Sequence, residues 1–590
     1  MTAAPSPLTA NARRILEARY LRRDAQGKVI ETPEELFARV AKAVAQAELG
    51  YGHASQVAQW EETFATLLSS LDFLPNSPAL MNAGLPIGQL SACFVLPLED
   101  TMEGIFETLK QAALVQRTGG GTGFSFSHLR PKGDRVHSTG GEASGPVSFM
   151  KIFDSATEHI KQGGRRRGAN MGILRVDHPD ILDFIQAKLD QTTLKNFNIS
   201  VGVTDAFLHA VRNQAEYELI HPTTRQVVRR LSARKVFEAI VQAAWQTGDP
   251  GLIFLDAINR TNPTPALGSF EATNPCGEVP LLPNESCNLG SINLAHCVRG
   301  APTKPAIDWE KVERLVPVAL RFLDNLLDVN RYPTPAIAQM SLGTRKIGLG
   351  VMGFAELLIR LGIPYDSQEA IALGSQLMQV IAQVAERASM QLAEERGVFP
   401  HWPHSVYASR NQKRRNATCT AIAPTGTISL LAGTTPSIEP LFAIVSRRIH
   451  SLGGEPLYEI APLLIEACHV HHIDPEQLLS QVRRTRRLRD IPGLPESMTR
   501  VFVTALEIHP EQHLLMQAAF QRHVENSVSK TINLPEEAPP SEVEWAFWRA
   551  WELNLKGITI FRYGSKGDQV LEWPDTREDL AIPTTQCHPC

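Results

Sequence analysis

Three side chains at alternating positions of one short segment could act together on a ligand. The sequence Asn274-Pro275-Cys276-Gly277-Glu278 places a thiol between an amide and a carboxylate. The proline and the glycine beside the cysteine favour a tight loop over a helix or a central strand. Residues two apart in an extended loop point the same way, so Asn274, Cys276 and Glu278 could face one ligand. A buried cysteine in a turn, next to a surface glutamate, is the alternative interpretation.

Further cysteines lie far from this loop along the chain. Cys93 opens an apolar run, Cys287 lies in the segment Ser286-Cys287-Asn288-Leu289-Gly290, and Cys587 and Cys590 close the chain. A Cys-x-x-Cys pair in a polar, proline-containing tail is typical of a redox dithiol. Half of a zinc site is the alternative, but no second pair at ligand spacing accompanies it, so we predict no metal site. The thiols of Cys297, Cys419 and Cys468 are expected in the core.

Glycine-rich and basic segments could contact phosphate groups. Residues 119–123 are nearly all glycine, and residues 163–170 combine glycine with Arg165-Arg166-Arg167. Backbone N–H groups and arginine side chains together suit a nucleotide, although the arginines could equally form a solvated charge cluster. The turn Pro424-Thr425-Gly426-Thr427-Ile428 precedes an apolar run, which predicts a phosphate cradle at the start of a helix. The lysine of a phosphate-binding P-loop is missing, which excludes a P-loop ATPase.

The run Gly348-Leu349-Gly350-Val351-Met352-Gly353 fits the G-x-G-x-x-G pattern of dinucleotide-binding proteins. Such a fold requires a buried strand directly before the first glycine. The preceding residues 339–347 are too polar and contain a glycine, so close backbone packing is the better explanation for these glycines. A dehydrogenase remains an alternative that rests on this pattern alone.

Composition and charge restrict the class of protein. Of 590 residues, 43% are hydrophobic and 20% charged, which is typical of a globular chain and excludes a mostly disordered one. The 58 basic and 62 acidic side chains leave a net charge of −4, which gives no electrostatic reason to expect nucleic acid as a partner. No apolar run approaches the roughly 20 residues of a membrane span, and the first residues lack an apolar signal core. We therefore expect a cytoplasmic protein without membrane contact.

The elements that must position these residues fall into three predicted parts. Residues 1–72 form a small helical domain, in which Thr32-Pro33-Glu34-Glu35 predicts a capped helix start. Residues 73–564 alternate short apolar runs with longer helical patterns, which predicts an α/β fold. Residues 565–590 are polar and contain three prolines, as expected of a flexible, redox-active C-terminal tail.

Together these segments resemble the large catalytic subunit of ribonucleotide reductases, in the family's order over residues 70 to 590. The residues that carry the resemblance are the loop 274–278, Cys93, Cys287, Pro75-Asn76-Ser77-Pro78, the turn 424–429 and the cysteine-containing tail. The similarity is to class II, the adenosylcobalamin-dependent branch that reduces diphosphates and forms dimers. Thr559 and Ile560 stand where class I enzymes carry two adjacent tyrosines, no glycyl-radical motif of class III is present, and residues 528–535 look like class II sequences. A class I large subunit with a separate radical subunit is the alternative within the family.

The resemblance implies a ten-stranded α/β barrel, with Cys276 at the tip of a central finger loop. It implies that a 5′-deoxyadenosyl radical from adenosylcobalamin takes the hydrogen of Cys276, whose thiyl then removes the ribose 3′ hydrogen. Glu278 would act as general base on the 3′-OH, and Asn274 would hold the substrate. Cys93 and Cys287 would supply two electrons and end as a disulfide. Cys587 and Cys590 would re-reduce them by exchange, and a thioredoxin-like reductant would restore the tail.

The resemblance also implies binding residues and partners. The ribonucleotide substrate is expected at Ser77, Ala92, Gly121, Pro424, Thr425, Gly426, Thr427 and Ile428. Deoxynucleoside triphosphate effectors are expected at Asp100, Arg130, Arg166 and Arg167. The chain is expected to form a homodimer, without nucleic acid or membrane. A redox or zinc-binding protein on an unrelated α/β scaffold is the alternative outside the family.

Overall fold

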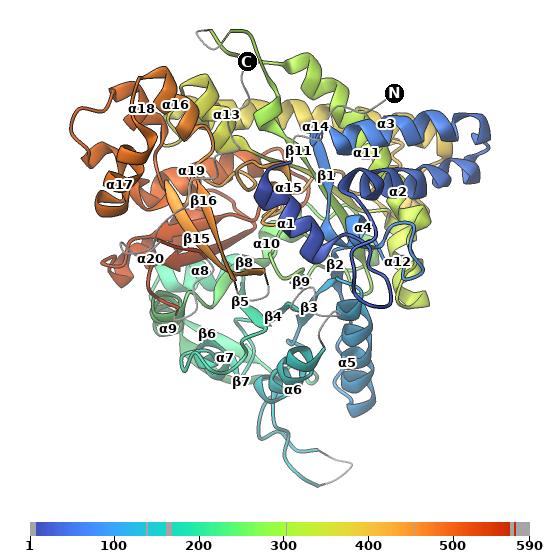
Figure 1. The fold of residues 1–590 in the computed structure, drawn as a ribbon. Helices are drawn as coiled ribbons and strands as arrows, with labels where there is room; N and C mark the ends of the chain where they lie inside the picture. The colour runs from blue at the N-terminus through green and yellow to red at the C-terminus, as the bar shows by residue number, and fades with distance from the viewer. Residues whose placement is uncertain are drawn as a thin grey trace.

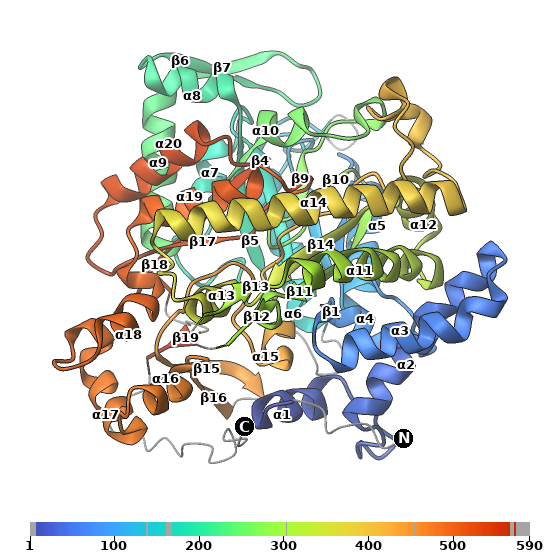
Figure 2. The same cartoon turned by 90° about the horizontal axis from the view of Figure 1, so that it is seen from above.

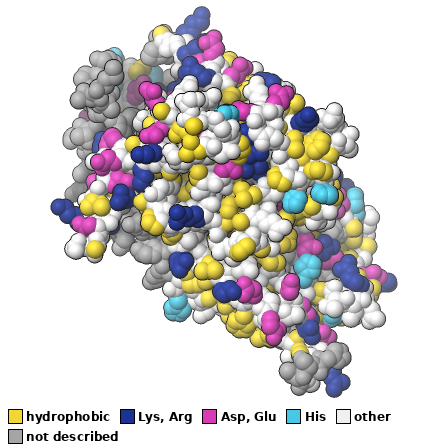
Figure 3. Space-filling model, turned by 90° about the vertical axis from the view of Figure 1, so that its right-hand side faces the viewer, with side chains coloured by type: hydrophobic (Ala, Val, Ile, Leu, Met, Phe, Trp, Pro, Cys, Tyr) yellow, Lys and Arg dark blue, Asp and Glu magenta, His cyan; other side chains and the backbone are white. Residues whose placement is uncertain are grey.

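The computed structural model describes residues 8–136, 140–160, 168–301, 304–452, 455–566 and 571–573. Helices surround a curved sheet that occupies the middle of the molecule (Figures 1 and 2). None of the helices in these ranges combines the length and the apolar character needed to cross a membrane. On the face shown in Figure 3, basic and acidic side chains are interspersed with apolar ones, as expected from the nearly balanced charge.

The chain begins with three helices, α1 (Ala10–Arg19), α2 (Pro33–Ala45) and α3 (Val57–Ser69). The start of α2 is the capping box that the sequence predicts, because the Thr32 hydroxyl accepts from Glu35 N (3.2 Å) and the Glu35 carboxylate accepts from Thr32 N (2.8 Å). Leu36, Val40 and Val44 of α2 are fully buried. The helical region thus packs its apolar face toward the rest of the chain.

Ten strands form one mixed sheet. They are β1 (Phe73–Pro75), β2 (Cys93–Val95), β3 (Gly121–Ser125), β4 (Asn170–Arg175), β5 (Phe197–Val203), β8 (Gly251–Phe254), β11 (Ser286–Asn293), β14 (Ile347–Met352), β17 (Thr531–Leu534) and β18 (Gly557–Arg562). Strands β2, β3, β4, β5 and β8 pair in parallel, as do β11 with β14 and β17 with β18.

The two parallel halves run in opposite directions and meet at two antiparallel seams. One seam joins β11 to β2 and to the short strand β1, and the other joins β18 to β8. Parallel bridges from Leu349 to Thr420 and from Ile422 to Val528 connect the remaining edges. The sheet therefore closes on itself, and the predicted ten-stranded α/β barrel is confirmed.

Helices cover the outer face of the barrel, as parallel strands require. The principal ones are α5 (Met102–Arg117), α6 (Pro146–His159), α8 (Asp205–Arg212), α9 (Ala233–Thr247), α11 (Trp309–Val329), α12 (Pro335–Thr344), α13 (Phe354–Leu361), α14 (Gln368–Arg396), α19 (Pro510–Gln521) and α20 (Pro540–Glu552). The other helices are α4 (Ser77–Asn82), α7 (Ile181–Gln186), α10 (Leu255–Arg260), α15 (Ile428–Ala432), α16 (Leu464–Val470), α17 (Pro475–Thr485) and α18 (Glu496–Val501). The long helix α14 lies across one side of the molecule (Figure 2).

A finger loop fills the inside of the barrel. Its two short strands, β9 (Ala272–Thr273) and β10 (Pro280–Leu281), pair antiparallel and carry the tip residues 274–279 between them. Val279 and Leu281 pack with side chains of the barrel wall such as Met171 and Cys287. The expected central finger loop is therefore present, with Cys276 at its tip.

Two glycines of β3 leave room for this finger. A Cβ atom built on Gly123 would lie 1.8 Å from the carbonyl oxygen of Thr273, and one on Gly121 would lie 2.8 Å from Cγ of Pro275. Any larger residue at position 123 would collide with the backbone of the finger, because a separation below 3 Å to a backbone atom cannot be relieved by a side-chain rotation. The glycine run at 119–123 thus serves the approach of two backbones.

The glycines of the G-x-G-x-x-G pattern also serve packing. Residues Ile347–Met352 form β14 itself, so Gly348 and Gly350 lie within a strand, and Gly353 alone stands between β14 and α13. A Cβ atom on Gly350 would lie 2.3 Å from the carbonyl oxygen of Ala421, and one on Gly348 would lie 2.5 Å from Leu289. The close packing predicted for these glycines is confirmed at Gly348 and Gly350.

A largely buried ionic network joins the helical region to the barrel helices. We call it the arginine network; its members are Arg321, Arg345, Arg396, Arg415, Glu48, Asp324, Asp328 and Glu395. Arg321 contacts both Glu48 and Glu395 at 2.6 Å, and Arg345 contacts Asp324 at 2.8 Å. The arginines lower the pKa of Asp324 to about 2 against the opposing effect of burial. Four cations and four anions therefore neutralise one another.

Two β-hairpins stand outside the barrel. One consists of β6 (Glu216–Ile220) and β7 (Val227–Ser232), and the other of β15 (Val445–Leu452) and β16 (Glu455–Ile460). A short strand, β19 (Leu571–Glu572), adds to the free edge of β15. These residues fall inside the predicted C-terminal tail, so the part of that tail that the structure describes lies against the second hairpin.

Candidate active site

Cys276 is the one member of the finger motif that opens to solvent. Its side chain is exposed, whereas Asn274 and Glu278 are each 2% exposed. A cavity of about 200 Å³ lies in front of Cys276. The positive φ of 81° at Gly277 turns the chain directly after the thiol, which favours glycine there. The tip thus presents a sulfur atom to the cavity, with an amide and a carboxylate of the same loop close by.

Hydrogen bonds from separate parts of the chain fix the finger tip. Val279 N donates to Oδ1 of Asn274 (3.0 Å), which holds the loop closed on itself. Asn198 Nδ2 on β5 donates to the carbonyl oxygen of Pro275 (2.8 Å), and Ser527 N donates to that of Glu278 (2.8 Å). The backbone on both sides of Cys276 is therefore tied to the barrel wall.

Lys556 supports the segment that carries Ser527. Its Nζ atom donates to the carbonyl oxygens of Glu525 (2.6 Å) and Asn526. Burial lowers the pKa of Lys556 to about 7, because the charged form loses its hydration. Asn198, Ser527 and Lys556 were not predicted from the sequence. They come from three distant segments and carry no local motif.

Cys93 and Cys287 face each other across the seam between β2 and β11. They are register partners in an antiparallel pair, and both are buried. Such partners have Cα atoms about 4.5–5.5 Å apart, within the roughly 4.4–6.8 Å that a disulfide requires. Burial raises the pKa of Cys287 well above its ordinary value, so this thiol keeps its proton at neutral pH. The pair can therefore donate hydrogen and then close to a disulfide.

Asn274 connects the finger tip to this cysteine pair, because its Nδ2 atom lies 3.2 Å from Sγ of Cys93. A second buried pair, Lys346 with Glu285 at 2.6 Å, lies close enough to influence the pKa of Cys287. Lys346 lowers the pKa of Cys287 and Glu285 raises it, but burial has the largest effect. The structure thus brings together four of the predicted catalytic residues, with Glu278 on the same loop. Cys297, Cys419 and Cys468 are buried, as predicted.

The predicted phosphate cradle lies directly before α15. Thr425 has a positive φ of 53°, and its hydroxyl accepts from Ser437 N (2.7 Å), which fixes the turn. Gly426 is exposed, and no atom lies within 4 Å of its Cβ position. The turn therefore leaves open space above Gly426, on the side where Thr427 and Ile428 begin α15.

The remaining predicted substrate residues lie at the start of α4 and along β2 and β3. Ser77 Oγ is 2.7 Å from the hydroxyl of Tyr20, which links the helical region to this position. Gly121 N donates to the carbonyl oxygen of Ala92 (2.8 Å). Ala92 directly precedes Cys93, so these positions border the cysteine pair.

Two of the predicted effector residues are paired with each other. Arg130 donates through Nε to Oδ2 of Asp100 (2.8 Å) and through its backbone N to Oδ1 (3.1 Å). Both side chains are half-buried at the edge of the barrel. Arg166 and Arg167, together with Cys587 and Cys590, lie outside the described residues.

One group of described residues has a spacing that could hold a metal ion. It consists of Glu48, His53 and Glu395. Arg321 and Arg396 already contact these carboxylates, so the charge that a cation would balance is balanced by arginine. The two carboxylates of this group belong to the arginine network, whose arginines leave no uncompensated negative charge there for a cation.

The cavity at Cys276 has the chemistry that a nucleoside group requires. Its wall includes the hydroxyls and amides of Asn198, Ser200, Ser527, Ser529 and Thr559, and the backbone of Gly251 and Gly557. No tyrosine is among its described lining residues, and Thr559, which the family resemblance aligns with a tyrosine of class I enzymes, lines the same cavity as Cys276. Small polar side chains around an open thiol fit the adenosyl group of adenosylcobalamin.

Known families match almost the whole chain. Residues 91–414 and 410–561 match the family described as ribonucleotide reductase, barrel domain, and residues 6–88 match ribonucleotide reductase, all-alpha domain. The vitamin B12-dependent ribonucleoside-diphosphate reductase of Mycobacterium tuberculosis (strain H37Rv) is 52% identical over 97% of this chain and 80% of its own length. That of Thermoplasma acidophilum is 47% identical over 96% of this chain and 80% of its own length.

A solved structure supports the fold. The α subunit of the class Id ribonucleotide reductase of Actinobacillus ureae superposes with a TM-score of 0.77, at 22% identity, over 94% of this chain and 97% of its own. At that identity the likeness concerns the barrel architecture alone. The identity to the two curated relatives and the family match show that the chain belongs to the ribonucleotide reductase family, in the branch of the vitamin B12-dependent ribonucleoside-diphosphate reductases.

Proposed function

We propose that this protein reduces ribonucleoside diphosphates to 2′-deoxyribonucleoside diphosphates, with adenosylcobalamin as cofactor, for DNA precursor synthesis. The observation that carries the proposal is the exposed thiol of Cys276 between Asn274 and Glu278, next to the Cys93–Cys287 pair. The hydroxyl and amide groups around Cys276 would hold the adenosyl group. When bound, adenosylcobalamin supplies the radical that removes the hydrogen atom of this thiol.

The chain's own residues then act on the ribose. The sulfur of Cys276 takes the 3′ hydrogen atom, while the carboxylate of Glu278 accepts the proton of the 3′-OH. Cys93 donates a proton to the 2′-OH, which leaves as water. Cys93 and Cys287 together give two electrons and two protons and form one disulfide, and Cys276 returns a hydrogen atom to the 3′ position. One ribonucleotide and two thiols thus yield one deoxyribonucleotide, one water and one disulfide.

The buried position of the cysteine pair suits this order of events. A thiol with a raised pKa is a poor nucleophile at neutral pH, so Cys287 stays reduced until the substrate radical requires its electrons. The amide of Asn274 contacts Cys93 and holds the closed finger tip, so it would couple the substrate position to the thiol that donates the proton.

The proposal includes a reductant, nucleotide effectors and a second copy of the chain as partners. We infer that Cys587 and Cys590 return electrons from a thioredoxin-like reductant to the Cys93–Cys287 disulfide. Deoxynucleoside triphosphates would act as specificity effectors near Asp100 and Arg130, where the paired carboxylate would orient the guanidinium group. We further propose a homodimer and a cytoplasmic location, where DNA precursors are made.

One assay tests the central claim. The purified chain is mixed with adenosylcobalamin, a ribonucleoside diphosphate and dithiothreitol, and deoxynucleotide is measured without any second protein. We expect turnover. A strict need for an iron or manganese subunit would contradict the proposal and favour the class I alternative. Hydride transfer with a nicotinamide would contradict it in favour of the dehydrogenase alternative.

A further inference from the structure

A fully buried ion pair lies next to Cys287. Lys346 Nζ and Glu285 Oε2 are 2.6 Å apart, and both side chains are 0% exposed. Asn288 and Ile347 are the first register pair of the parallel strands β11 and β14. Cys287 and Lys346 directly precede these two residues, so they are neighbours on adjacent strands. Side chains at neighbouring positions of a sheet point to the same face, and the ammonium group therefore lies on the face of the thiol.

This face is the inside of the barrel. Lys346 Nζ lies 4.4 Å from the centre of the Phe270 ring, and Phe270 belongs to the same buried cluster as Cys287. A Cβ atom on Gly348, two positions after Lys346, would meet the side chain of Leu289. Leu289 in turn lies two positions after Cys287, and residues two apart share one face of a strand. The lysine and the cysteine pair are therefore enclosed in the same apolar interior.

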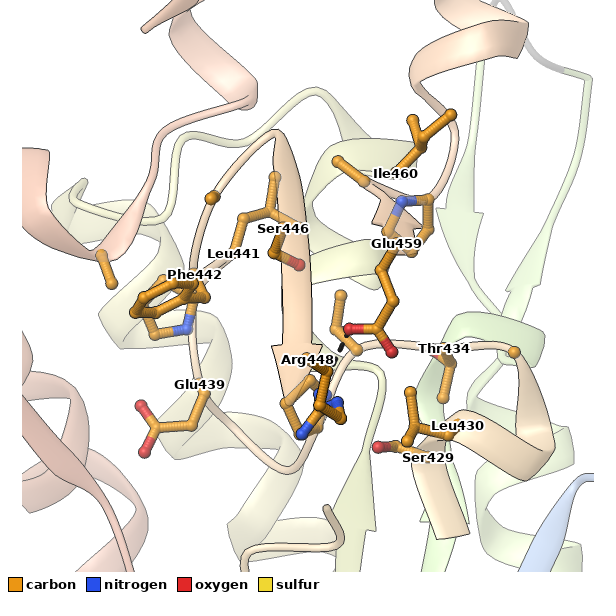
Figure 4. A pocket seen from close by; sticks show the side chains of 18 of the residues that line it. Ser429, Leu430, Thr434, Glu439, Leu441, Phe442, Ser446, Arg448, Glu459 and Ile460 are labelled. Carbon is orange, nitrogen blue, oxygen red and sulfur yellow. Dashed lines mark hydrogen bonds and ion pairs between the residues drawn. The ribbon is translucent and has the colours of Figure 1, made fainter. Parts of the chain in front are cut away.

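The complete burial of this pair differs from that of an ion pair at a cavity. Arg448 and Glu459 contact each other at 3.2 Å in the wall of a cavity of about 340 Å³, where their side chains are 15% and 21% exposed (Figure 4). Lys346 and Glu285 are not among the described residues that line this cavity or the one at Cys276. An isolated, fully buried pair contributes little net stability, because the loss of hydration offsets the attraction. Its place beside a thiol favours a chemical role.

Reduction of a Cys93–Cys287 disulfide would create a negative charge in this interior. A thiolate that attacks one sulfur releases the other as a thiolate, and the exchange is faster when the leaving thiolate is more stable. Cys93 contacts Asn274 at the finger tip, which is the side that opens to solvent at Cys276. An incoming thiolate therefore reaches Cys93 first, and Cys287 is the leaving group. Burial raises the pKa of Cys287 well above its ordinary value, so its thiolate needs a nearby cation.

We propose that the ammonium group of Lys346 stabilises and protonates the Cys287 thiolate when a dithiol reduces the Cys93–Cys287 disulfide. This inference rests on the proposed function, in which the disulfide forms in each turnover. The first thiolate of the reductant bonds to Sγ of Cys93, the S–S bond breaks, and its electron pair passes to Sγ of Cys287, which takes a proton from Lys346. The second thiol of the reductant then displaces Cys93. Its proton restores the ammonium group, and Cys93 takes up the proton that the first thiol had released to solvent.

Glu285 keeps this lysine charged and in place. Its Oε2 atom accepts from Leu282 N (2.6 Å) as well as from Lys346. A carboxylate at this distance favours the ammonium form of lysine despite burial. The hydrogen bond from Leu282 continues to hold the carboxylate when the proton moves to Cys287. Lys346 thus supplies a proton where the described residues show no opening to solvent.

Reduction of the disulfide can be measured apart from turnover. Diamide oxidises the cysteine pair of the full chain, and mass spectrometry of alkylated peptides follows its reduction by dithiothreitol. In Lys346→Met we expect reduction to be at least about tenfold slower than in the wild type, whereas Lys346→Arg keeps the charge and should stay within about threefold. The matched control is Lys311→Met, which removes a lysine that pairs with Asp72 at 2.9 Å and acts on another buried thiol, Cys297. It should leave the rate unchanged.

A double variant separates the missing cation from the carboxylate that it leaves behind. Glu285→Gln combined with Lys346→Met contains no uncompensated charge at the pair, and we expect it to stay at least about tenfold slow. Recovery of the wild-type rate in the double variant would overturn the inference, as would a wild-type rate in Lys346→Met or equal slowing in Lys311→Met.

A separate measurement tests the proposed function. One turnover of the wild-type chain with adenosylcobalamin and a ribonucleoside diphosphate, without reductant, should leave the Cys93–Cys287 disulfide in the peptide analysis. If that disulfide were missing while the reduction rates of the diamide-treated variants followed the expected order, the proposed function would be contradicted and the effect of Lys346 on the cysteine pair would stand. A wild-type chain that formed the disulfide in neither experiment would overturn both.

Discussion

The finger tip and the arginine network both bury polar side chains, but they satisfy them in opposite ways. In the arginine network, each charged side chain contacts another charged side chain, and four arginines face four carboxylates. At the finger tip, the backbone is fixed by Asn198 and Ser527, while the thiol of Cys276 faces an open cavity. The network therefore stabilises the fold, and the tip keeps its reactive group available to a ligand.

The sharpest test of this difference is the Cys276→Ser substitution. Because the side chain is exposed, the free energy of unfolding should change by less than about 0.5 kcal/mol. Because no other group replaces the thiyl, turnover should fall by about 10⁴-fold or more. Deoxynucleotide formation and thermal unfolding measure the two effects. Cys297→Ser is the matched control: it removes a buried thiol, so it should lower stability and leave turnover intact, and the opposite pattern would refute the assignment.

The next largest effect is expected from Glu278→Gln. Removal of a general base lowers kcat by about 10²–10⁴-fold, and the amide keeps the size of the side chain, so KM and the unfolding midpoint should change little. Steady-state kinetics with a ribonucleoside diphosphate provides the measurement. Glu271→Gln is the control on the same finger, since Glu271 contacts His128 at 2.6 Å away from the tip. Equal losses in the two variants would argue against a special role of Glu278.

On the other side of the comparison, Asp324→Asn should affect stability rather than chemistry. The carboxylate contacts Arg345, Arg396 and Arg415 and is fully buried, so its removal leaves buried charges uncompensated and costs about 3–5 kcal/mol. Denaturant unfolding measures this loss, and turnover per folded molecule should stay unchanged. Glu218→Gln breaks an exposed pair and should cost less than about 1 kcal/mol. A loss of turnover in folded Asp324→Asn would show that the arginine network also affects the chemistry, which would contradict the comparison.

The same network predicts how stability depends on pH. Neighbouring arginines lower the pKa of Asp324 and of Glu48 to about 2 in the folded state. A carboxyl whose pKa is lower in the folded chain stabilises the fold above its ordinary pKa and ceases to do so as the pH falls toward its folded value. We expect a loss of about 2 kcal/mol for each carboxylate between roughly pH 4.5 and pH 2. Asp324→Asn should flatten this decline in equilibrium unfolding; an unchanged slope would contradict the pairing.

Lys556→Met should give the smallest effect on turnover, and it should change stability and turnover together. The substitution removes the Lys556 donor from the Glu525 carbonyl and leaves the Asn526 carbonyl with Gln521 Nε2 as its donor, which costs about 1–3 kcal/mol. Since Ser527 of the same segment holds Glu278, kcat should also fall, by up to about tenfold. Kinetics and unfolding on one preparation measure both changes. Lys311→Met breaks a contact of 2.9 Å to Asp72 outside the site and should leave kcat unchanged; a matching loss there would show that the effect is general.

The sequence predicted local features better than contacts between distant segments. The capping box at Thr32 and the finger motif at Cys276 depend on residues within a few positions of one another, so their patterns can be recognised along the chain. The α/β class followed from alternating apolar runs, and the barrel from the family resemblance. Asn198, Ser527 and Lys556 could not be predicted, because only the closure of the barrel brings them to the finger. The pairing of β19 with β15 was missed for the same reason.

The two β3 glycines that admit the finger also restrict where the thiol can be. Because Gly123 meets the finger backbone and Gly121 meets Pro275, the depth to which the loop enters the barrel depends on two positions that contribute no functional group. Adding a single methyl group on the facing wall would push the sulfur away from its site without altering any reacting atom. In this molecule, the position of the Cys276 thiol depends partly on the absence of side chains at two positions of a neighbouring strand.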